Sequence, residues 1–196
     1  MSFIIGLTGP TGAGKSSITK TAEGVGFYVI DCDAVSREAV VKGSEGLAAL
    51  TAAFGKDILD ENLELDRKAL AKKAFATKEN TELLNKTILP YISKIVLSRA
   101  KNHDKLILDA PTLFESGLDS ICDKTIAVLA DRDIRLARIL KRDAIEKSAA
   151  ELRMNAGKND DFYKNKADII IFNNGDVKDF TREFENIMVG LFENTL

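Results

Sequence analysis

The residues best suited to chemistry lie near the amino terminus, in the sequence GPTGAGKS at positions 9–16. This sequence fits the pattern G-x-x-x-x-G-K-[ST] at every fixed position. Its glycines let consecutive backbone N–H groups turn inward and form an anion nest at the positive end of a helix. Lys15 can then reach the β- and γ-phosphates of a nucleotide, and the hydroxyl of Ser16 can ligate Mg²⁺. A glycine-rich turn without this role would not need lysine and serine after Gly14, so the segment is interpreted as a phosphate-binding loop.

Two carboxylates, Asp31 and Asp33, follow the apolar residues Val29 and Ile30. If a strand ends here, their period of two makes both lean the same way, at the carboxyl edge where doubly wound sheets bind ligands. A carboxylate at that edge could orient an acceptor hydroxyl and take its proton as the bond to phosphorus forms. The alternative is that either residue caps the following helix, a common role of aspartate after a strand. Beside a phosphate-binding loop, catalysis by Asp33 is the favoured interpretation.

A third carboxylate, Asp109, ends the apolar run Leu106–Leu108. This pattern is typical of a Walker B aspartate, which holds Mg²⁺ directly or through water. Many strands end in aspartate because of turn chemistry, so the alternative is a purely structural role. We expect Asp109 and Ser16 to bind the metal ion.

Three arginines recur at helical spacing downstream, with Arg135, Arg138 and Arg142 on one stripe. A stripe of charge is most often a solvated face, and this is the expectation for Arg135. Arg142 lies where the helix enters a polar segment, within reach of a transferring phosphate. An arginine brought in by a closing lid would stabilise transition-state charge and exclude water. The apolar residues of this helix occupy another face and are expected to pack on the sheet: Leu136, Ile139 and Leu140.

The elements that must position these residues alternate between short apolar runs and longer helical patterns. Uninterrupted apolar runs are typical of strands covered on both faces, and the alternation implies right-handed crossovers and a parallel sheet. Strands are predicted over residues 3–7, 27–31, 105–109, 124–129 and 167–172. Helices are predicted over residues 15–23, 131–143 and 176–194.

Two segments interrupt this alternation. Residues 34–103 show only helical periodicity and are predicted to form a helical insert beside the mouth of the sheet. Residues 144–166 are polar and charged and are expected to form a mobile lid. The core would then comprise residues 1–33, 104–143 and 167–196.

Composition limits the other classes of function. Among 196 residues, 28 Lys and Arg stand against 30 Asp and Glu, and the net charge of −2 argues against binding of nucleic acid or membrane by bulk electrostatics. The single histidine, His103, excludes a His-rich metal site and argues against a Ser-His-Asp or Cys-His hydrolase. The two cysteines, Cys32 and Cys122, cannot build a disulfide framework. With no basic leader and no membrane-length apolar run, a cytoplasmic protein is expected.

Several motifs together resemble the dephospho-CoA kinase family, whose members catalyse the last step of coenzyme A biosynthesis. The resemblance covers essentially the whole chain. The phosphate-binding loop is common to many nucleotide-binding proteins, whereas the D-x-D and D-x-P-x-L-F-E stretches are much more specific. The matching motifs are GLTG at 6–9, IDCDA at 30–34, DAPTLFESGL at 109–118, RD at 142–143 and ADIIIFNNG at 167–175.

The resemblance implies an α/β fold of the P-loop NTPase type, in three layers. Its five-stranded parallel sheet would be flanked by helices, and it would carry a helical CoA-binding insert and a lid, matching residues 34–103 and 144–166. The implied reaction is transfer of the γ-phosphoryl group of ATP to the ribose 3′-hydroxyl of dephospho-CoA, with Mg²⁺ accompanying ATP. A monomer or a small homo-oligomer is expected.

The resemblance also implies roles for single residues. Asp33 becomes the base, and Lys15 and Arg142 become the phosphate clamps. The residues implied to bind ATP are Thr11, Gly12, Ala13, Gly14, Lys15, Ser16, Ser17, Asn174 and Gly175, the last two in a loop on the adenine side. The residues implied to border the acceptor are Thr8, Asp33, Leu113, Phe114 and Glu115.

Two other functions compete with this prediction. A different small P-loop kinase, for a nucleoside, a nucleotide or shikimate, would share the phosphate chemistry, and the acceptor-side motifs argue against it. A nucleotide-dependent switch protein needs N-K-x-D and D-x-x-G motifs. The sequences NNGD at 173–176 and DAPT at 109–112 lack the required lysine and glycine. Leu89 and Gly157 stand where the family usually has histidine and glutamine, so no role is carried over to them.

Overall fold

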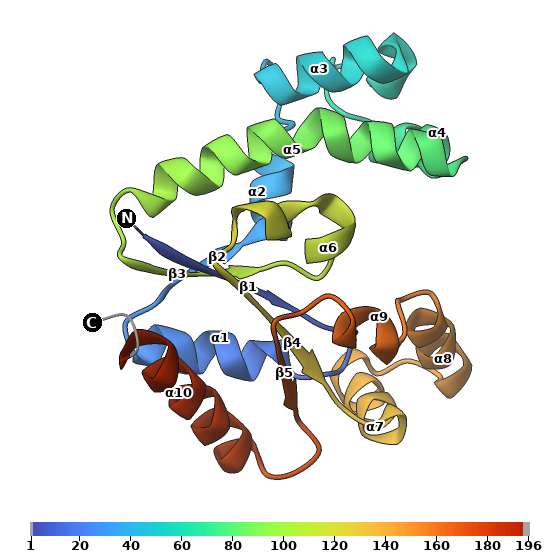
Figure 1. The fold of residues 1–196 in the computed structure, drawn as a ribbon. Coiled ribbons are helices and arrows are strands. Elements are labelled where there is room, and N and C mark those ends of the chain that lie inside the picture. The colour runs from blue at the N-terminus through green and yellow to red at the C-terminus, as the bar shows by residue number, and fades with distance from the viewer. Residues whose placement is uncertain (1, 194–196) are drawn as a thin grey trace.

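A five-stranded sheet forms the centre of the computed structural model, which describes residues 2–193 (Figure 1). All adjacent strands are parallel, in the order β2-β3-β1-β4-β5. The predicted parallel sheet is therefore confirmed, with boundaries that differ from the predicted ones by at most two residues. The strands are β1 (Phe3–Thr8), β2 (Tyr28–Asp31), β3 (Lys105–Asp109), β4 (Lys124–Leu129) and β5 (Ile169–Phe172).

Helices cover both faces of the sheet because alternate strand residues point to opposite faces. Ile5 and Leu7 pack against α1 (Lys15–Gly24) and α10 (Val177–Glu193) on one face. On the other face, Ile4 packs towards α5 (Lys78–Ala100). The result is three layers, helix, sheet and helix (Figure 1).

The helix predicted over residues 15–23 is α1, and the helix predicted over residues 131–143 is α7 (Arg132–Asp143). The helix predicted over residues 176–194 is α10. Its predicted last residue, Asn194, lies outside the described residues.

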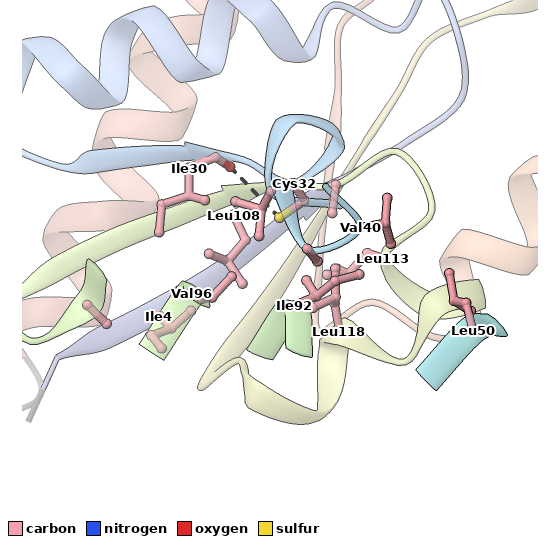
Figure 2. Packing of buried hydrophobic residues seen from close by; sticks show 14 of the residues in the cluster. Ile4, Ile30, Cys32, Val40, Leu50, Ile92, Val96, Leu108, Leu113 and Leu118 are labelled. Carbon is pink, nitrogen blue, oxygen red and sulfur yellow. Dashed lines mark hydrogen bonds between the residues drawn. The ribbon is translucent and has the colours of Figure 1, made fainter. Parts of the chain in front are cut away.

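Residues 34–103 are mainly helical, and an isolated bridge between Leu59 and Leu65 is the one piece of strand-like pairing in this fully described segment. The segment shares a hydrophobic core with the sheet, so the predicted boundary between core and insert at residue 34 does not coincide with a break in the packing. Figure 2 shows Leu50 and Val96 from this segment in one apolar cluster with Ile4 of the sheet. The helices here are α2 (Cys32–Glu38), α3 (Glu45–Phe54), the 3-10 turn η1 (Lys56–Ile58), α4 (Arg67–Ala74) and α5.

Helix α5 is long and crosses from the insert to the sheet. It begins after Thr77, whose hydroxyl accepts a hydrogen bond from the N–H of Asn80 at 3.1 Å. Pro90 lies inside the helix and removes one intrahelical hydrogen bond, yet the helix continues to Ala100 because Ile92 and the residues after it pack into the sheet cluster. Neither α5 nor any other helix in the described part of the chain is long and apolar enough to cross a membrane.

Strand β5 begins at Ile169 rather than at the predicted residue 167, beside an aspartate that bridges to β4. Asp168 accepts hydrogen bonds at 2.7 Å from both the N–H and the hydroxyl of Thr125. Its own N–H donates to the same hydroxyl at 3.0 Å. The hydrogen bond from the Thr125 side chain is the largest cause that lowers the pKa of Asp168 below its usual value.

Replacing Asp168 by alanine should reduce the free energy of unfolding at pH 7 by about 1 kcal/mol, because buried Thr125 loses its partner. The folded-state pKa of Asp168 is lowered, so its contribution is present above the unfolded pKa and is lost as the pH falls through the folded one. In urea unfolding, the difference between parent and variant should therefore shrink from pH 7 to about pH 3. An equal difference in the free energy of unfolding at both pH values would contradict this account. The control is Asp179→Ala, at an exposed position of α10.

The remaining helices follow β3 and β4 along the chain. Two predictions for α7 are wrong. Its apolar residues, expected on the sheet, pack with Ala150 and Met154 of α8. Arg135, expected to be solvated, is buried, because its backbone lies against Gly12 of the phosphate-binding loop and its side chain pairs with Asp160 at 3.5 Å. The elements are α6 (Leu113–Ser116), the 3-10 turn η2 (Leu118–Ile121), α7, α8 (Lys147–Asn155) and α9 (Asp160–Lys164).

Candidate active site

The topology of the sheet creates a crevice between two strands. Strands β1 and β3 are neighbours, and their connections leave in opposite directions, β1 towards β2 and β3 towards β4. Open parallel sheets bind ligands at the carboxyl ends of such strands. The loop at residues 9–14 follows β1, and Asp109 ends β3. The two predicted phosphate and metal elements are thus side by side.

The backbone of the phosphate-binding loop requires glycine at its two ends. Gly9 has φ 139° and a Cβ there would lie 2.2 Å from the carbonyl oxygen of Val128. Gly14 has φ 104° and a Cβ would lie 2.1 Å from Nδ2 of Asn173. Helix α1 begins at Lys15 with no side-chain cap on its first turn. Its first N–H groups are therefore left for a ligand, as the anion-nest interpretation requires.

Replacing Gly14 by alanine should abolish nucleotide binding, because the added methyl group collides with Asn173 and the positive φ is strained for any residue with a side chain. Calorimetric titration with ADP would measure the loss, which we expect to be at least about a hundredfold. Gly24→Ala is the matched control, since its added Cβ meets nothing within 4 Å. Unchanged ADP affinity in Gly14→Ala would contradict the geometry of the loop.

A cleft of about 700 Å³ opens over the loop. Basic side chains dominate its charged lining, which suits a polyphosphate ligand. Nine of the residues predicted from sequence line it: Thr11, Gly12, Gly14, Lys15, Ser16, Ser17, Asp109, Glu115 and Arg142. Five further polar residues that no prediction assigned also line it: Thr112, Arg138, Arg153, Lys158 and Tyr163. Asn173, which precedes Asn174 and Gly175 in the loop predicted on the adenine side, lines it as well. The signal available for Arg138 was its place in the arginine stripe, whereas Arg153 and Lys158 belong to a charged segment with no distinguishing spacing.

The ammonium group of Lys15 is directed back onto the loop. It donates a hydrogen bond to the carbonyl oxygen of Gly9 at 2.8 Å. Burial lowers the pKa of Lys15, and the carboxylates of Asp109 and Asp33 oppose this effect. A partly desolvated ammonium gains most from an anion placed beside it, so Lys15 is suited to a phosphate group.

Asp109 supplies a carboxylate oxygen with no partner. Its Oδ1 atom is buried and accepts no hydrogen bond within the described chain. Burial raises the pKa of Asp109, Lys15 lowers it, and Asp31 and Asp33 raise it further. An unsatisfied carboxylate in the same cleft as Ser16 fits a hard cation. Residues 2–193 hold no cluster of three or more His, Cys, Asp or Glu side chains suited to a metal. This fits Mg²⁺, which is usually held by one or two carboxylates together with phosphate oxygens and water.

The two aspartates of the D-x-D motif have separate positions. Strand β2 ends at Asp31, which caps α2 by accepting the N–H of Ala34 at 3.0 Å. The prediction that both side chains lean the same way is wrong, because the helix begins between them, at Cys32. Asp33 lies in the first turn of α2, exposed, and its carboxylate takes part in no hydrogen bond or ion pair within residues 2–193. It is close enough to Lys15 to influence its pKa. The structure therefore assigns capping to Asp31 and leaves Asp33 free.

Two residues predicted to border the acceptor lie in the protein interior. Thr8 is fully buried, and its hydroxyl donates to the carbonyl oxygen of Pro111 at 3.3 Å. Leu113 is fully buried in the cluster between the sheet and α5. Neither residue lines the cleft, which corrects the prediction: Thr8 lies in the central strand β1, and Leu113 is on the inward face of α6.

Of the next two residues of this motif, Glu115 lines the cleft and Phe114 does not. Phe114 is half-buried and packs edge-on against Phe162 of α9, with ring centroids 6.1 Å apart. Glu115 lines the cleft, and its Oε2 atom is buried with no hydrogen-bond partner in the described residues. The backbone carbonyl of Glu115 accepts a hydrogen bond from the side chain of Asn85 in α5. This bond ties α6 to the helical insert.

Hydrogen bonds around the cleft tie α7 to α8 and to the loop after β5. Arg142, at the end of α7, donates to both carboxylate oxygens of Asp143, at 2.7 and 2.9 Å, and Arg153 of α8 pairs with the same carboxylate. The hydrogen bonds to Asp143 raise the pKa of Arg142. Asn174 exchanges two hydrogen bonds with Asp131, at 2.8 and 2.9 Å, so its side chain anchors the loop. Neither Asn174 nor Gly175 lines the cleft, and their contact with a nucleotide stays a prediction.

Comparison with known proteins decides the family. The family model for dephospho-CoA kinase matches residues 3–179. The chain belongs to the dephospho-CoA kinase family. It is 36% identical over 185 residues to the dephospho-CoA kinase of Fusobacterium nucleatum, covering 93% of this chain and 95% of that protein. Membership makes the chain an ATP-dependent kinase by homology.

Solved structures agree with this assignment. The dephospho-CoA kinase from Campylobacter jejuni superposes with a TM-score of 0.65 and 25% identity, over 100% of both chains. TT1252 from Thermus thermophilus superposes with a TM-score of 0.76 and 24% identity, over 97% of this chain and 98% of that one, and supports the fold. The predicted P-loop kinase fold is therefore confirmed.

Proposed function

We propose that this chain transfers the γ-phosphoryl group of ATP to the ribose 3′-hydroxyl of dephospho-CoA. The observation that carries the proposal is the carboxylate of Asp33, which has no hydrogen bond or ion pair within residues 2–193 and lies close enough to Lys15 to raise its pKa. A base next to the phosphate clamp is what transfer to an alcohol requires. Membership of the dephospho-CoA kinase family supplies the identity of the alcohol.

The residues divide the work of phosphoryl transfer. The N–H groups at the start of α1 and the ammonium of Lys15 bind and orient the phosphates of ATP. Ser16 and Asp109 would hold Mg²⁺, which when bound neutralises charge on the β- and γ-phosphates. Asp33 accepts the proton of the acceptor hydroxyl as its oxygen bonds to the γ-phosphorus. The bond from that phosphorus to the β,γ-bridging oxygen breaks at the same time, and ADP leaves with the electron pair.

The parts of the chain take separate roles in this proposal. The insert at residues 34–103 binds the CoA part of the acceptor, beside Phe114 and Glu115. The lid at residues 144–166 closes over the cleft, and Arg142 at its base stabilises the transferring phosphate. The basic lining contributed by α8 and the residues after it supports this role. A cytoplasmic monomer or small homo-oligomer that binds neither nucleic acid nor membrane completes the proposal.

A coupled assay of ADP formation tests the acceptor. Mg-ATP is supplied with dephospho-CoA, adenosine, a nucleoside monophosphate, shikimate or no acceptor, and mass spectrometry identifies the product. We expect only dephospho-CoA to stimulate turnover strongly, with a phosphate added at the ribose. Stimulation by shikimate or a monophosphate, but not by dephospho-CoA, would assign a different small P-loop kinase.

A further inference from the structure

Two side chains from separate elements hold one carbonyl group of the phosphate-binding loop. Asn173, directly after β5, donates from Nδ2 to the carbonyl oxygen of Ala13 at 2.8 Å. Arg138 of α7 donates from Nη1 to the same oxygen at 3.2 Å. Nη2 of Arg138 also donates to Oδ1 of Asn173 at 3.1 Å. The three groups form a closed triangle, which we call the Ala13 clamp.

The surroundings of Asn173 and the position of α7 hold the clamp in place. Asn173 is only 2% exposed, and its N–H donates to the carbonyl oxygen of Leu129 at 2.8 Å. Helix α7 lies directly on the loop, since a Cβ at Gly12 would come within 2.8 Å of the carbonyl oxygen of Arg135. The amide of Asn173 likewise fills the space that a side chain at position 14 would need. Asn173 is thus in close contact with the loop.

Holding this carbonyl determines where the following N–H points. No cis peptide bond occurs among the described residues, so the N–H of Gly14 points away from the carbonyl of Ala13 across a planar trans peptide. The N–H of Ala13 is itself engaged with the carbonyl oxygen of Pro10 at 3.2 Å. The N–H of Gly14 has no partner among the described residues and is therefore available to a phosphate. If the peptide turned over, a carbonyl oxygen would face the phosphate and repel it.

We propose that Arg138 and Asn173 are positioning residues that hold the peptide between Ala13 and Gly14, so that the N–H of Gly14 binds a nucleotide phosphate. The inference rests on the ATP-binding half of the proposed function and not on the identity of the acceptor. Both residues act through the same oxygen, so loss of either should release the same peptide. This shared action is what separates the clamp from a direct contact between Arg138 and a phosphate.

A double-mutant cycle measures whether the two residues act as one. Calorimetry with ADP compares the parent, Asn173→Ala, Arg138→Met and the double variant. Each single variant should weaken ADP binding about tenfold, as expected for loss of one charge-assisted or buried hydrogen bond. The ADP affinity of the double variant should be no more than about threefold weaker than that of either single variant, because each single substitution already frees the same peptide group. The control is Arg182→Met, an exposed arginine on α10.

Two results would overturn the clamp. If the losses in the double variant multiply to about a hundredfold, Arg138 binds the nucleotide independently of Asn173. If folded single variants bind ADP as the parent does, the carbonyl of Ala13 needs no support. Neither result depends on which acceptor is phosphorylated, so failure of the acceptor assay and failure of the clamp are distinguishable.

A measurement on the unsubstituted protein covers the case in which a variant does not fold. Amide hydrogen exchange followed by NMR should show the N–H of Gly14 exchanging fast without ligand and becoming protected when ADP is added. The N–H of Ala13 should be protected in both states because of its bond to Pro10. A Gly14 amide that stays unprotected at saturating ADP would overturn the proposal.

Discussion

Replacing Lys15 by alanine should lower kcat at least about a thousandfold and weaken ATP binding. The Lys15 ammonium lies at the phosphate-binding loop, and burial has already stripped part of its hydration, as its lowered pKa indicates. Its only hydrogen bond in the described structure, to the carbonyl oxygen of Gly9, is one that a phosphate oxygen could replace. Steady-state assays of ADP formation with dephospho-CoA would measure the effect.

The matched control for Lys15 is Lys20→Ala. Lys20 is an exposed residue of the same helix, α1, and does not line the cleft. It should retain parental kinetics. Turnover of Lys15→Ala within about tenfold of the parent, in a protein with an unchanged melting temperature, would exclude the phosphate-binding role of the loop lysine.

Replacing Asp33 by asparagine should lower kcat by a factor of about a hundred to ten thousand, with little change in the KM for ATP. Asparagine keeps the shape of the side chain but cannot accept the proton of the acceptor hydroxyl. Because Asp33 makes no hydrogen bond or ion pair within the described chain, the substitution should also leave the melting temperature nearly unchanged. Kinetics with ATP and dephospho-CoA varied separately would distinguish chemistry from binding.

Asp31 offers a control in the same motif. Its carboxylate caps α2, and asparagine is an equally good capping residue, so Asp31→Asn should preserve kcat. Near-parental kcat in Asp33→Asn would remove the base assignment. A large loss in Asp31→Asn with none in Asp33→Asn would transfer the role to Asp31.

One carboxylate pairs with two arginines at the start of the segment proposed to form a lid. Asp143 accepts hydrogen bonds from Arg142 at the end of α7 and from Arg153 of α8. Both arginines line the cleft, so a phosphate that enters it competes with Asp143 for them. In this arrangement two guanidinium groups line the cleft, and both are paired with the carboxylate of Asp143.

Local patterns predicted much of this protein correctly. The apolar runs at residues 105–109 and 124–129 are the strands β3 and β4, because a run buried on both faces has few other conformations open to it. The loop at residues 9–16 was also identified from its sequence pattern, since that pattern depends on fixed spacing within one short segment. These features need no knowledge of distant neighbours.

Features that depend on a partner element were predicted less well. The apolar stripe of α7 was correctly expected to be buried, but its partner is α8 and not the sheet. Arg135 was expected in solvent. It is buried by contact with the loop at Gly12, which the helical pattern alone could not reveal. Thr8 and Leu113 carry the family motif but face the interior. A helical pattern states which residues share a face, not what that face meets.

The amino-acid sequence by itself determined the strands of the sheet, the glycine-rich loop and the family of this protein, because each resides in residues close together along the chain. Only the tertiary structure decided that Asp31 caps a helix while Asp33 stays free, and that Arg138 and Asn173 meet at the carbonyl of Ala13. The last two residues are 125 and 160 positions away from Ala13. The physical reason is that a hydrogen bond between such distant groups exists only once the sheet has placed the ends of its strands at one edge.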